Sequence, residues 1–287
     1  MLRDKYNIDK QPKEEQTEMS FLDHLDELRT RIINSLVAVA LVGIIFWIFN
    51  KWLFTYVIFG PSNIDFPTYR FFCSLGQRFC IQPPEFTKQA VGFGESFIIS
   101  IKASFALGFI AVFPYVFWQF WKFIRPGLHE NEQMATRRVV AICSTLFLVG
   151  VLFGYFIISP FAISFLMGYT LPGVENIPTV SSYIGYMLMF TAPAGLVFEL
   201  PVVVYFLARV GLVTPEFMRQ YRKHAIVLTL VVAAVLTPPD VMSQMLLGTP
   251  LYILYEVSIF IAAWVVRKEK EKEEAEYGGT PPKEQKG

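Results

Sequence analysis

The strongest constraint on this chain is a series of apolar stretches, each close to the length that a helix needs to cross a lipid bilayer. A spanning helix takes about 20 largely apolar residues to cross about 30 Å of hydrocarbon. Six stretches are candidates, at residues 32–52, 104–124, 139–166, 184–208, 225–236 and 245–266. The chain is 54% hydrophobic and 17% charged, whereas about 25% of the residues in soluble domains are charged. The sequence therefore predicts an all-α membrane protein.

The fifth stretch covers about a dozen residues, which is marginal for a span and also fits a re-entrant or buried helix. The distribution of positive charge decides between these alternatives. If the stretch is a span, all but five of the 25 Lys and Arg residues fall on one side of the membrane. Because positive charge marks the cytoplasmic side, we predict six spans with both termini in the cytoplasm. The five exceptions are Lys51, Arg70, Arg78, Lys88 and Lys102.

The remaining segments divide the chain into a membrane domain and two tails. Residues 1–19 form a polar cytoplasmic tail that lacks the apolar run of a cleaved signal peptide, and residues 20–266 form the membrane domain. The outer loop, about residues 53–96, is long and proline-rich, so we expect a structured cap. Its Cys73 and Cys80 fit a disulfide or two free thiols equally well. Residues 267–287 alternate Lys with Glu and predict a frayed helix followed by a disordered tail.

An amphipathic helix is predicted from Ser20 to Ile32, just before the first span. Its polar side carries Asp23, Asp26 and Glu27, and such carboxylates can hold a cationic ligand through bidentate guanidinium contacts. The alternative is a self-paired helix surface, because Glu27 and Arg31 stand four residues apart. Spacing alone favours this alternative.

A second acidic group follows the second span. Pro126 and Gly127 end the helix there, and Glu130 and Glu132 come to the cytoplasmic surface. A solvated turn at the head of the third span explains these carboxylates as well, because acids favour a helix N-terminus. The loop alone does not distinguish a binding site from a turn.

Glu199 lies inside the fourth apolar stretch, where an ionised side chain costs about 2.5–3.5 kcal/mol. Pro193 and Pro201 flank it and free backbone carbonyls, which suits a kinked helix facing protein or water. We therefore expect Glu199 to bind a polar partner helix or to relay protons. Between the last two stretches, residues 237–244 form a Pro-Pro turn in which Asp240 fits a helix cap.

Sequence motifs of enzymes are missing from the chain. It contains no GxxxxGK[ST] loop, no HExxH and no GxSxG, so nucleotide hydrolysis and proteolysis are not indicated. The cysteines lack metal-type spacing. The net charge of +1 does not suggest a nucleic-acid partner. We expect neither enzymatic activity nor a cofactor.

Four motifs, in this order, resemble the TatC family, the large subunit of the twin-arginine protein translocase. They are His24–Arg31, Trp121–Leu128 with Glu132, Phe198–Pro201, and Thr237–Gln244. The resemblance runs from about residue 20 to 267. It implies a cupped, glove-like six-helix bundle whose concave face opens sideways to lipid. It also implies a receptor that binds twin-arginine signal peptides of folded proteins and works with the proton-motive force in the bacterial inner membrane.

The resemblance assigns roles to single residues. Glu27 and Glu132 match the acids that receive the two arginines of the signal, and Arg29 and Phe123 match positions around that site. Glu199 matches an acid associated with single-span TatA/TatB-type partners, and Gln244 is expected to be a polar group for the same partners. Homo-oligomerisation within the receptor complex is also expected. Residues that match the family's structural motifs are Pro126, Pro201, Pro238 and Asp240.

Two positions depart from the family pattern, and both make the site more acidic. Gln133 stands where a basic residue is frequent, and Asp26 stands where an apolar residue is common. Two other functions remain as alternatives. One is a proton-coupled solute carrier that uses Glu199, although the internal repeat of such carriers is not evident. The other is an assembly scaffold in which Glu27 and Glu132 are dispensable.

Overall fold

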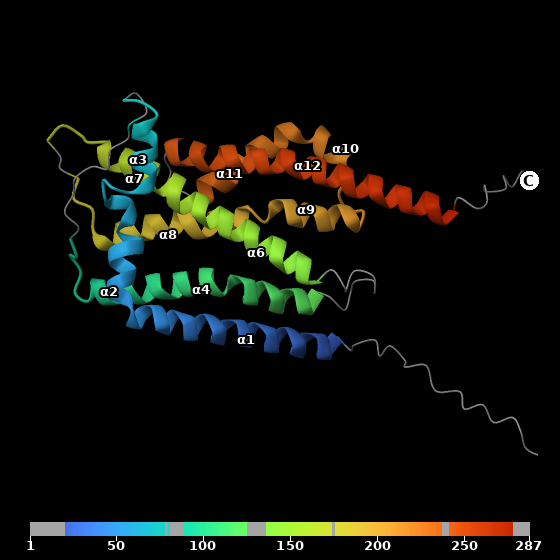
Figure 1. Cartoon of the computed structure of the whole chain (residues 1–287), viewed down its shortest axis with the longest axis horizontal. Coiled ribbons are helices and arrows are strands. Elements are labelled where there is room, and N and C mark those ends of the chain that lie inside the picture. Colours follow the sequence, from blue (N-terminus) through green and yellow to red (C-terminus); the bar gives the residue numbers. More distant parts are fainter. Residues whose placement is uncertain are drawn as a thin grey trace, which may run out of the picture.

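The long helices lie side by side and form an elongated bundle (Figure 1). The computed structural model describes residues 21–77, 80, 89–124, 136–173, 176–236 and 241–277. Within these residues the regular structure is helical, apart from an isolated bridge between Gln89 and Thr179. The expected all-α membrane bundle is confirmed.

The helices cover the predicted apolar stretches and extend several of them. The longest are α1 (Phe21–Ile48), α4 (Glu95–Ile124), α6 (Thr136–Phe153), α8 (Val180–Val197) and α12 (Val241–Tyr277). The π-helix η4 (Gly154–Ile158) and helix α7 (Ser159–Gly168) continue α6, and α9 (Leu200–Arg209) continues α8. Within the described residues, five helical segments are long and apolar enough to cross a bilayer: 24–48, 95–123, 138–168, 180–209 and 243–271.

The short fifth apolar stretch is part of a longer broken helix. Helix α11 (Arg222–Leu236) has 15 residues, and the six-residue α10 (Pro215–Gln220) precedes it with only Tyr221 between them. Tyr221 stays hydrogen-bonded on both sides, because its N–H donates to Phe217 and its carbonyl accepts from Ala225. At about 1.5 Å per residue, α10 and α11 together reach about 33 Å. The sequence placed the start of this segment too late because α10 is polar.

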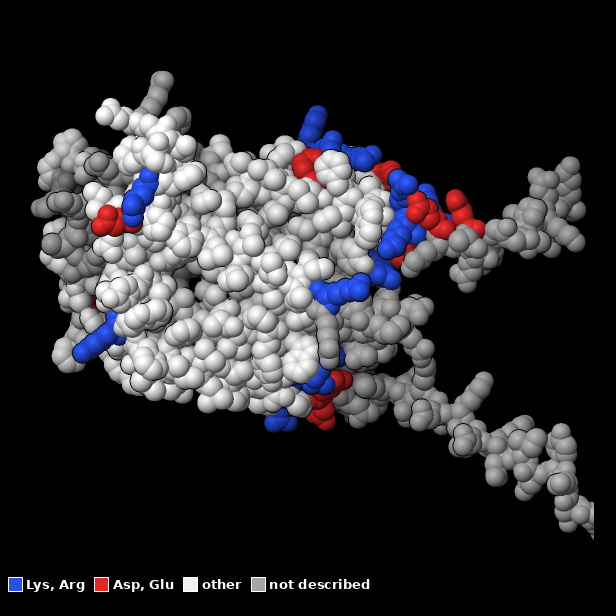
Figure 2. Space-filling model, in the orientation of Figure 1, with Lys and Arg blue, Asp and Glu red and all other residues white. Residues whose placement is uncertain are grey.

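The two ends of the bundle differ in charge. Helix α1 starts, and helix α12 finishes, at the same end of the bundle (Figure 1). Basic side chains gather at that end, whereas few lie at the opposite end (Figure 2). This distribution predicts that the first end faces the cytoplasm. Six crossings and two cytoplasmic termini remain predictions.

Glycines allow the helices to approach closely. A Cβ on Gly108 of α4 would lie 2.9 Å from the backbone nitrogen of Gly43 on α1. A Cβ on Gly150 or Gly154 would lie 2.6 Å from a backbone carbonyl oxygen of α8. Small residues serve this purpose in membranes, where packing and not the hydrophobic effect joins helices.

A proline break in the third span is completed by the outer cap. Pro160 has no N–H, so the carbonyl of Phe156 loses its helical partner. The hydroxyl of Thr68, on helix α3 (Pro67–Ser74), donates to that carbonyl instead. The cap thus satisfies a backbone group that hydrocarbon would leave unpaired.

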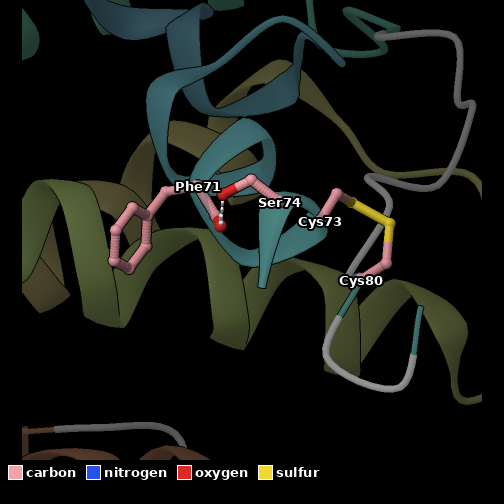
Figure 3. The surroundings of a disulfide bond; sticks show 4 residues. All are labelled: Phe71, Cys73, Ser74 and Cys80. Carbon is pink, nitrogen blue, oxygen red and sulfur yellow. Dashed lines mark hydrogen bonds between the residues drawn. A yellow bond between two sulfur atoms is a disulfide. The ribbon is translucent and has the colours of Figure 1, made fainter. Parts of the chain in front are cut away.

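The described part of the outer loop, together with the residues just before it, is folded into short helices. It comprises α2 (Asn50–Trp52), η1 (Leu53–Ile58), η2 (Gly60–Ser62) and α3. Tyr69 donates to the carbonyl of Pro61 at 2.8 Å, and Tyr183 donates to the carbonyl of Ile58 at 3.0 Å. Burial raises the pKa of the Tyr69 phenol. Cys73, near the C-terminal end of α3, forms a disulfide with Cys80 (Figure 3), which resolves the alternatives left open by the sequence.

We predict that Gly154→Ala destabilises the bundle by about 1–3 kcal/mol, the usual cost of overpacking. Its new Cβ would meet the carbonyl oxygen of Phe190 at 2.6 Å, and the helix backbone cannot move away cheaply. Gly185→Ala is the matched control, because no heavy atom lies within 4 Å of its Cβ position. Thermal unfolding in detergent should show a lower midpoint for Gly154→Ala alone. Equal midpoints for the two variants would contradict the close approach of α6 and α8.

Candidate functional site

A hydrogen-bonded group joins α1 and α4 at the cytoplasmic end of the bundle. Arg31 donates through Nη2 to Oε1 of Glu27 at 2.9 Å and through Nη1 to Oε1 of Gln119 at 3.2 Å. Gln119 is buried and donates in turn to the hydroxyl of Tyr115 at 2.6 Å. Arg31 therefore connects the acidic side of α1 to the interior face of α4.

Among the described residues, only one oxygen of the Glu27 carboxylate has a hydrogen-bond partner. Its Oε1 takes the Arg31 contact, while Oε2 is enclosed and has no hydrogen-bond partner among the described residues. The side chain of Glu27 is 21% exposed, so a ligand from the cytoplasm can reach its edge. An enclosed, unsatisfied carboxylate oxygen is costly, and a cationic donor would relieve that cost.

Aromatic side chains surround this group. The ring of His24 on α1 stacks on Phe123 of α4, with ring centroids 4.2 Å apart. Trp121 is buried and packs against Phe206 of α9, with centroids 4.9 Å apart. The cytoplasmic end of α4 is thereby held between α1 and α9.

The structure brings some of the predicted site residues together and leaves others apart. It brings Glu27 and Phe123 to neighbouring ends of α1 and α4, and it leaves Arg29 exposed on α1. The Glu27–Arg31 pair, which was predicted as the alternative to a binding site, is present. Glu132 and Pro126 lie outside the described residues.

Glu199 sits at the break between α8 and α9. Phe198 and Glu199 separate the two helices, and Pro201 is buried in the first turn of α9, where its missing N–H costs nothing. Both carboxylate oxygens of Glu199 are closed off from solvent, and no hydrogen bond of ordinary geometry reaches them from the described residues. The thiol of Cys143 on α6, a weak donor, lies beside the carboxylate.

An apolar groove of about 350 Å³ runs between α1, α4 and α6. Phe147 forms part of its wall, and the backbone of the same residue faces Glu199 from the other side. The Phe147 ring is held in place by stacking on Phe113 at 3.5 Å between centroids. Glu199 therefore lies one side chain behind the groove. The remaining lining includes Phe46, Leu107, Ile110, Pro114, Ser144 and Leu148.

Gln244 contacts a neighbouring helix of the bundle. Its Nε2 donates to the carbonyl of Leu230 at 3.0 Å, so it connects α12 to α11 near their outer ends. The amide thus already has a partner within the chain. Pro238 and Asp240, which precede α12 in the sequence, lie outside the described residues.

Glu256 is a second acidic residue within an apolar helix, and it was not predicted as a site residue from the sequence. Glu256 lies near the middle of the apolar segment of α12 and accepts from Arg222 of α11 at 2.8 Å and from Tyr252 at 2.9 Å. The two charged side chains are 46% and 26% exposed, for Arg222 and Glu256 respectively. The sequence could have indicated Glu256, because a carboxylate inside an apolar stretch is the same feature that indicated Glu199.

The fold and these groups define a class of protein: a multi-pass helical membrane protein with an acid–base group at its cytoplasmic end and an enclosed carboxylate within the bilayer. The described residues hold no cluster of His, Cys, Asp and Glu suited to a metal ion. Residues 23–250 match the family described as Sec-independent protein translocase protein TatC. The chain belongs to the TatC family.

Relatives and solved structures agree with this assignment. The chain is 38% identical over 267 residues to the Sec-independent protein translocase protein TatC of Blattabacterium, covering 89% of this chain and 99% of that protein. Identity to the TatC protein of Aquifex aeolicus is 34%, covering 90% and 100%. A crystal structure of the twin-arginine translocase receptor TatC superposes with a TM-score of 0.68 at 33% identity, covering 85% of this chain and 99% of that one.

We predict that Glu256→Gln lowers stability by about 1–3 kcal/mol, because Arg222 loses a charged hydrogen-bond partner inside the bilayer. Glu271→Gln is the control on the same helix, since the Arg267–Glu271 pair is 82% and 57% exposed and exposed ion pairs contribute little to stability. Thermal unfolding in detergent compares the two variants. Adding Arg222→Gln to Glu256→Gln should restore part of the loss, and a purely additive double variant would contradict a direct pair.

Proposed function

We propose that this chain is the core receptor subunit of a twin-arginine translocase in a bacterial inner membrane. It binds the twin-arginine signal peptides of folded proteins at its cytoplasmic face and supports their export, driven by the proton-motive force. It is a transport subunit and not an enzyme. The observation that carries the proposal is the half-used carboxylate of Glu27 at the cytoplasmic end of a TatC-family bundle.

The signal-binding site is proposed to form around Glu27. A guanidinium is planar and offers parallel N–H donors that match a carboxylate. Because Oε2 of Glu27 is enclosed while the side chain as a whole is 21% exposed, the groups that cover Oε2 move aside when the arginine binds, and Arg31 keeps its contact with Oε1. The stacked rings of His24 and Phe123 offer an apolar surface beside this carboxylate for the residues that follow the arginines. Arg29 is a proposed positioning group at the rim of the site.

Glu132 is proposed to bind the second arginine of the signal. It belongs to the loop between α4 and α6, and both helix ends lie at the cytoplasmic end of the bundle (Figure 1). Two carboxylates on separate segments would distinguish two adjacent arginines from a single one. Pro126 is proposed to end α4 and direct the loop towards α1.

Glu199 is proposed to recruit single-span TatA/TatB-type subunits within the membrane. Among the described residues its enclosed carboxylate accepts no hydrogen bond of ordinary geometry, so a polar side chain from a partner helix would gain a strong acceptor there. The groove in front of Phe147 offers apolar surface for such a helix. Gln244 is a second proposed polar contact for these partners, and Pro238 and Asp240 are proposed to shape the turn that precedes it. Homo-oligomerisation within the complex is proposed as well.

A proton-coupled solute carrier centred on Glu199 is not supported. The relatives and the superposed structures are translocase proteins throughout. The groove in front of Phe147 is lined almost wholly by apolar side chains, whereas a carrier for polar solutes needs polar groups to orient its substrate.

We predict that Glu27→Gln and Glu132→Gln each weaken binding of a twin-arginine signal peptide about 10- to 100-fold. This corresponds to about 1.5–3 kcal/mol for a charge-assisted hydrogen bond. Replacing the signal's arginines by lysines should weaken binding to the wild type as well, because lysine cannot make the bidentate contact. Affinity is measured by fluorescence anisotropy with the purified protein in nanodiscs.

Asp26→Asn is the matched control for this measurement. It removes a negative charge from the residue just before Glu27 on α1, and the side chain of Asp26 is exposed. Binding to this variant should stay within about twofold of the wild type at physiological salt, because exposed charges are screened. An equal loss of peptide affinity in Asp26→Asn and Glu27→Gln would show that general electrostatic attraction, and not a specific contact with Glu27, explains the effect.

Glu199→Ala should reduce co-purification of single-span partner subunits while leaving signal-peptide affinity within about twofold. The reason is that Glu199 lies at the α8–α9 break and the peptide site lies on α1 and α4. Leu196→Ala, an exposed apolar change in the last turn of α8, serves as the control. Unchanged partner recovery in Glu199→Ala would refute this role.

A further inference from the structure

Two segments far apart in the sequence are joined at the outer end of the bundle by one carboxylate. Glu95 is the first residue of α4, and its Oε2 accepts from the N–H groups of Val91 and Gly92 at 2.8 and 2.9 Å. Its Oε1 accepts from the N–H of Ser181, in the first turn of α8, at 3.1 Å. One side chain thus binds the end of the outer loop, α4 and α8 together.

Backbone hydrogen bonds also join the end of the outer loop to the start of α8. Val180 donates to the carbonyl of Gln89 at 2.9 Å, and Gln89 pairs with Thr179 in the isolated bridge. Thr179 caps α8 by accepting from Ser182 at 3.1 Å, which leaves the N–H of Ser181 for Glu95. Without the carboxylate, Ser181 would keep an unpaired helix-end donor near the membrane boundary.

The joined helices carry the two sites. Helix α4 runs about 40 Å from Glu95 to Phe123, beside the Glu27 carboxylate. Helix α8 runs from the same outer contact to the break at Glu199. Below Glu95 the helices pack through Ile99 and Ile184, which are both buried in one cluster. A change at their outer ends would therefore tilt one site relative to the other.

We propose that Glu95 is a positioning residue that fixes the outer ends of α4 and α8 to each other and so sets the placement of the signal-binding site relative to Glu199. The proposal rests on the proposed function of those two sites. Glu95 itself touches neither the signal peptide nor a partner helix. Its chemistry is that of a carboxylate with three backbone donors, and a neutral amide cannot satisfy all three, because one of its two polar atoms is itself a donor.

The test is Glu95→Gln, with distances measured between spin labels on α4 and α8. The labels are placed at Phe97 and Tyr186, which are 58% and 40% exposed, in a Cys143→Ser background that keeps the Cys73–Cys80 disulfide. The wild type should give one narrow distance distribution, and Glu95→Gln a broadened or longer one. Glu95→Asp, which keeps the charge but loses reach, should change in the same direction and serves if the amide variant does not fold.

Two further readouts separate positioning from a general loss of structure. Signal-peptide affinity of Glu95→Gln should stay within about twofold of wild type, while export of a twin-arginine cargo falls about tenfold. Glu216→Gln, the same change in the first turn of α10, should alter neither. An unchanged distance distribution, or an export loss that a loss of peptide affinity fully explains, would overturn the proposal. Failure of the wild type to bind the peptide would instead reject the proposed function, and the distance comparison would still decide the role of Glu95.

Discussion

The structure depends on one constraint, which is that the bilayer core has no water to satisfy a backbone N–H or carbonyl. Every departure from a continuous helix must therefore find its partner within the protein. The break at Pro160 is completed by Thr68, and the bend at Tyr221 keeps its hydrogen bonds to both flanking helices. The cap is consequently part of the membrane fold, because it supplies donors to a span.

The same constraint explains how the helices associate. Lipid tails are as apolar as the side chains, so close packing must hold the helices together. The contact of α1 with α4 at Gly43 and Gly108 brings Arg31 within reach of Gln119. The contact of α6 with α8 at Gly150 and Gly154 brings Cys143 to Glu199. Glycines that take no part in binding thereby determine which polar groups meet.

The carboxylates inside the bundle differ in how fully the chain itself provides their partners. Glu256 is neutralised within the chain by Arg222, and such a pair serves the assembly of α11 with α12. Glu199 has no cation beside it among the described residues, and Glu27 is satisfied at only one oxygen. Both of these incompletely satisfied acids of the described residues are groups for which we propose external partners. This difference separates a structural ion pair from a candidate binding group.

The sequence by itself determined the fold class, the family and most of the spans, because apolar length and the bias of Lys and Arg are local properties of the chain. It also singled out Glu27 and Glu199, whose surroundings in the sequence are unusual. It placed the start of the fifth apolar helix too late, because the polar residues of α10 hide a helix whose apolar side faces α12. It did not find the pairing of Glu256 with Arg222 or the contact of Glu95 with Ser181, which join residues 34 and 86 positions apart. Only the tertiary structure decided these, because a hydrogen bond between distant segments depends on how the helices pack and leaves no periodic signal in the chain.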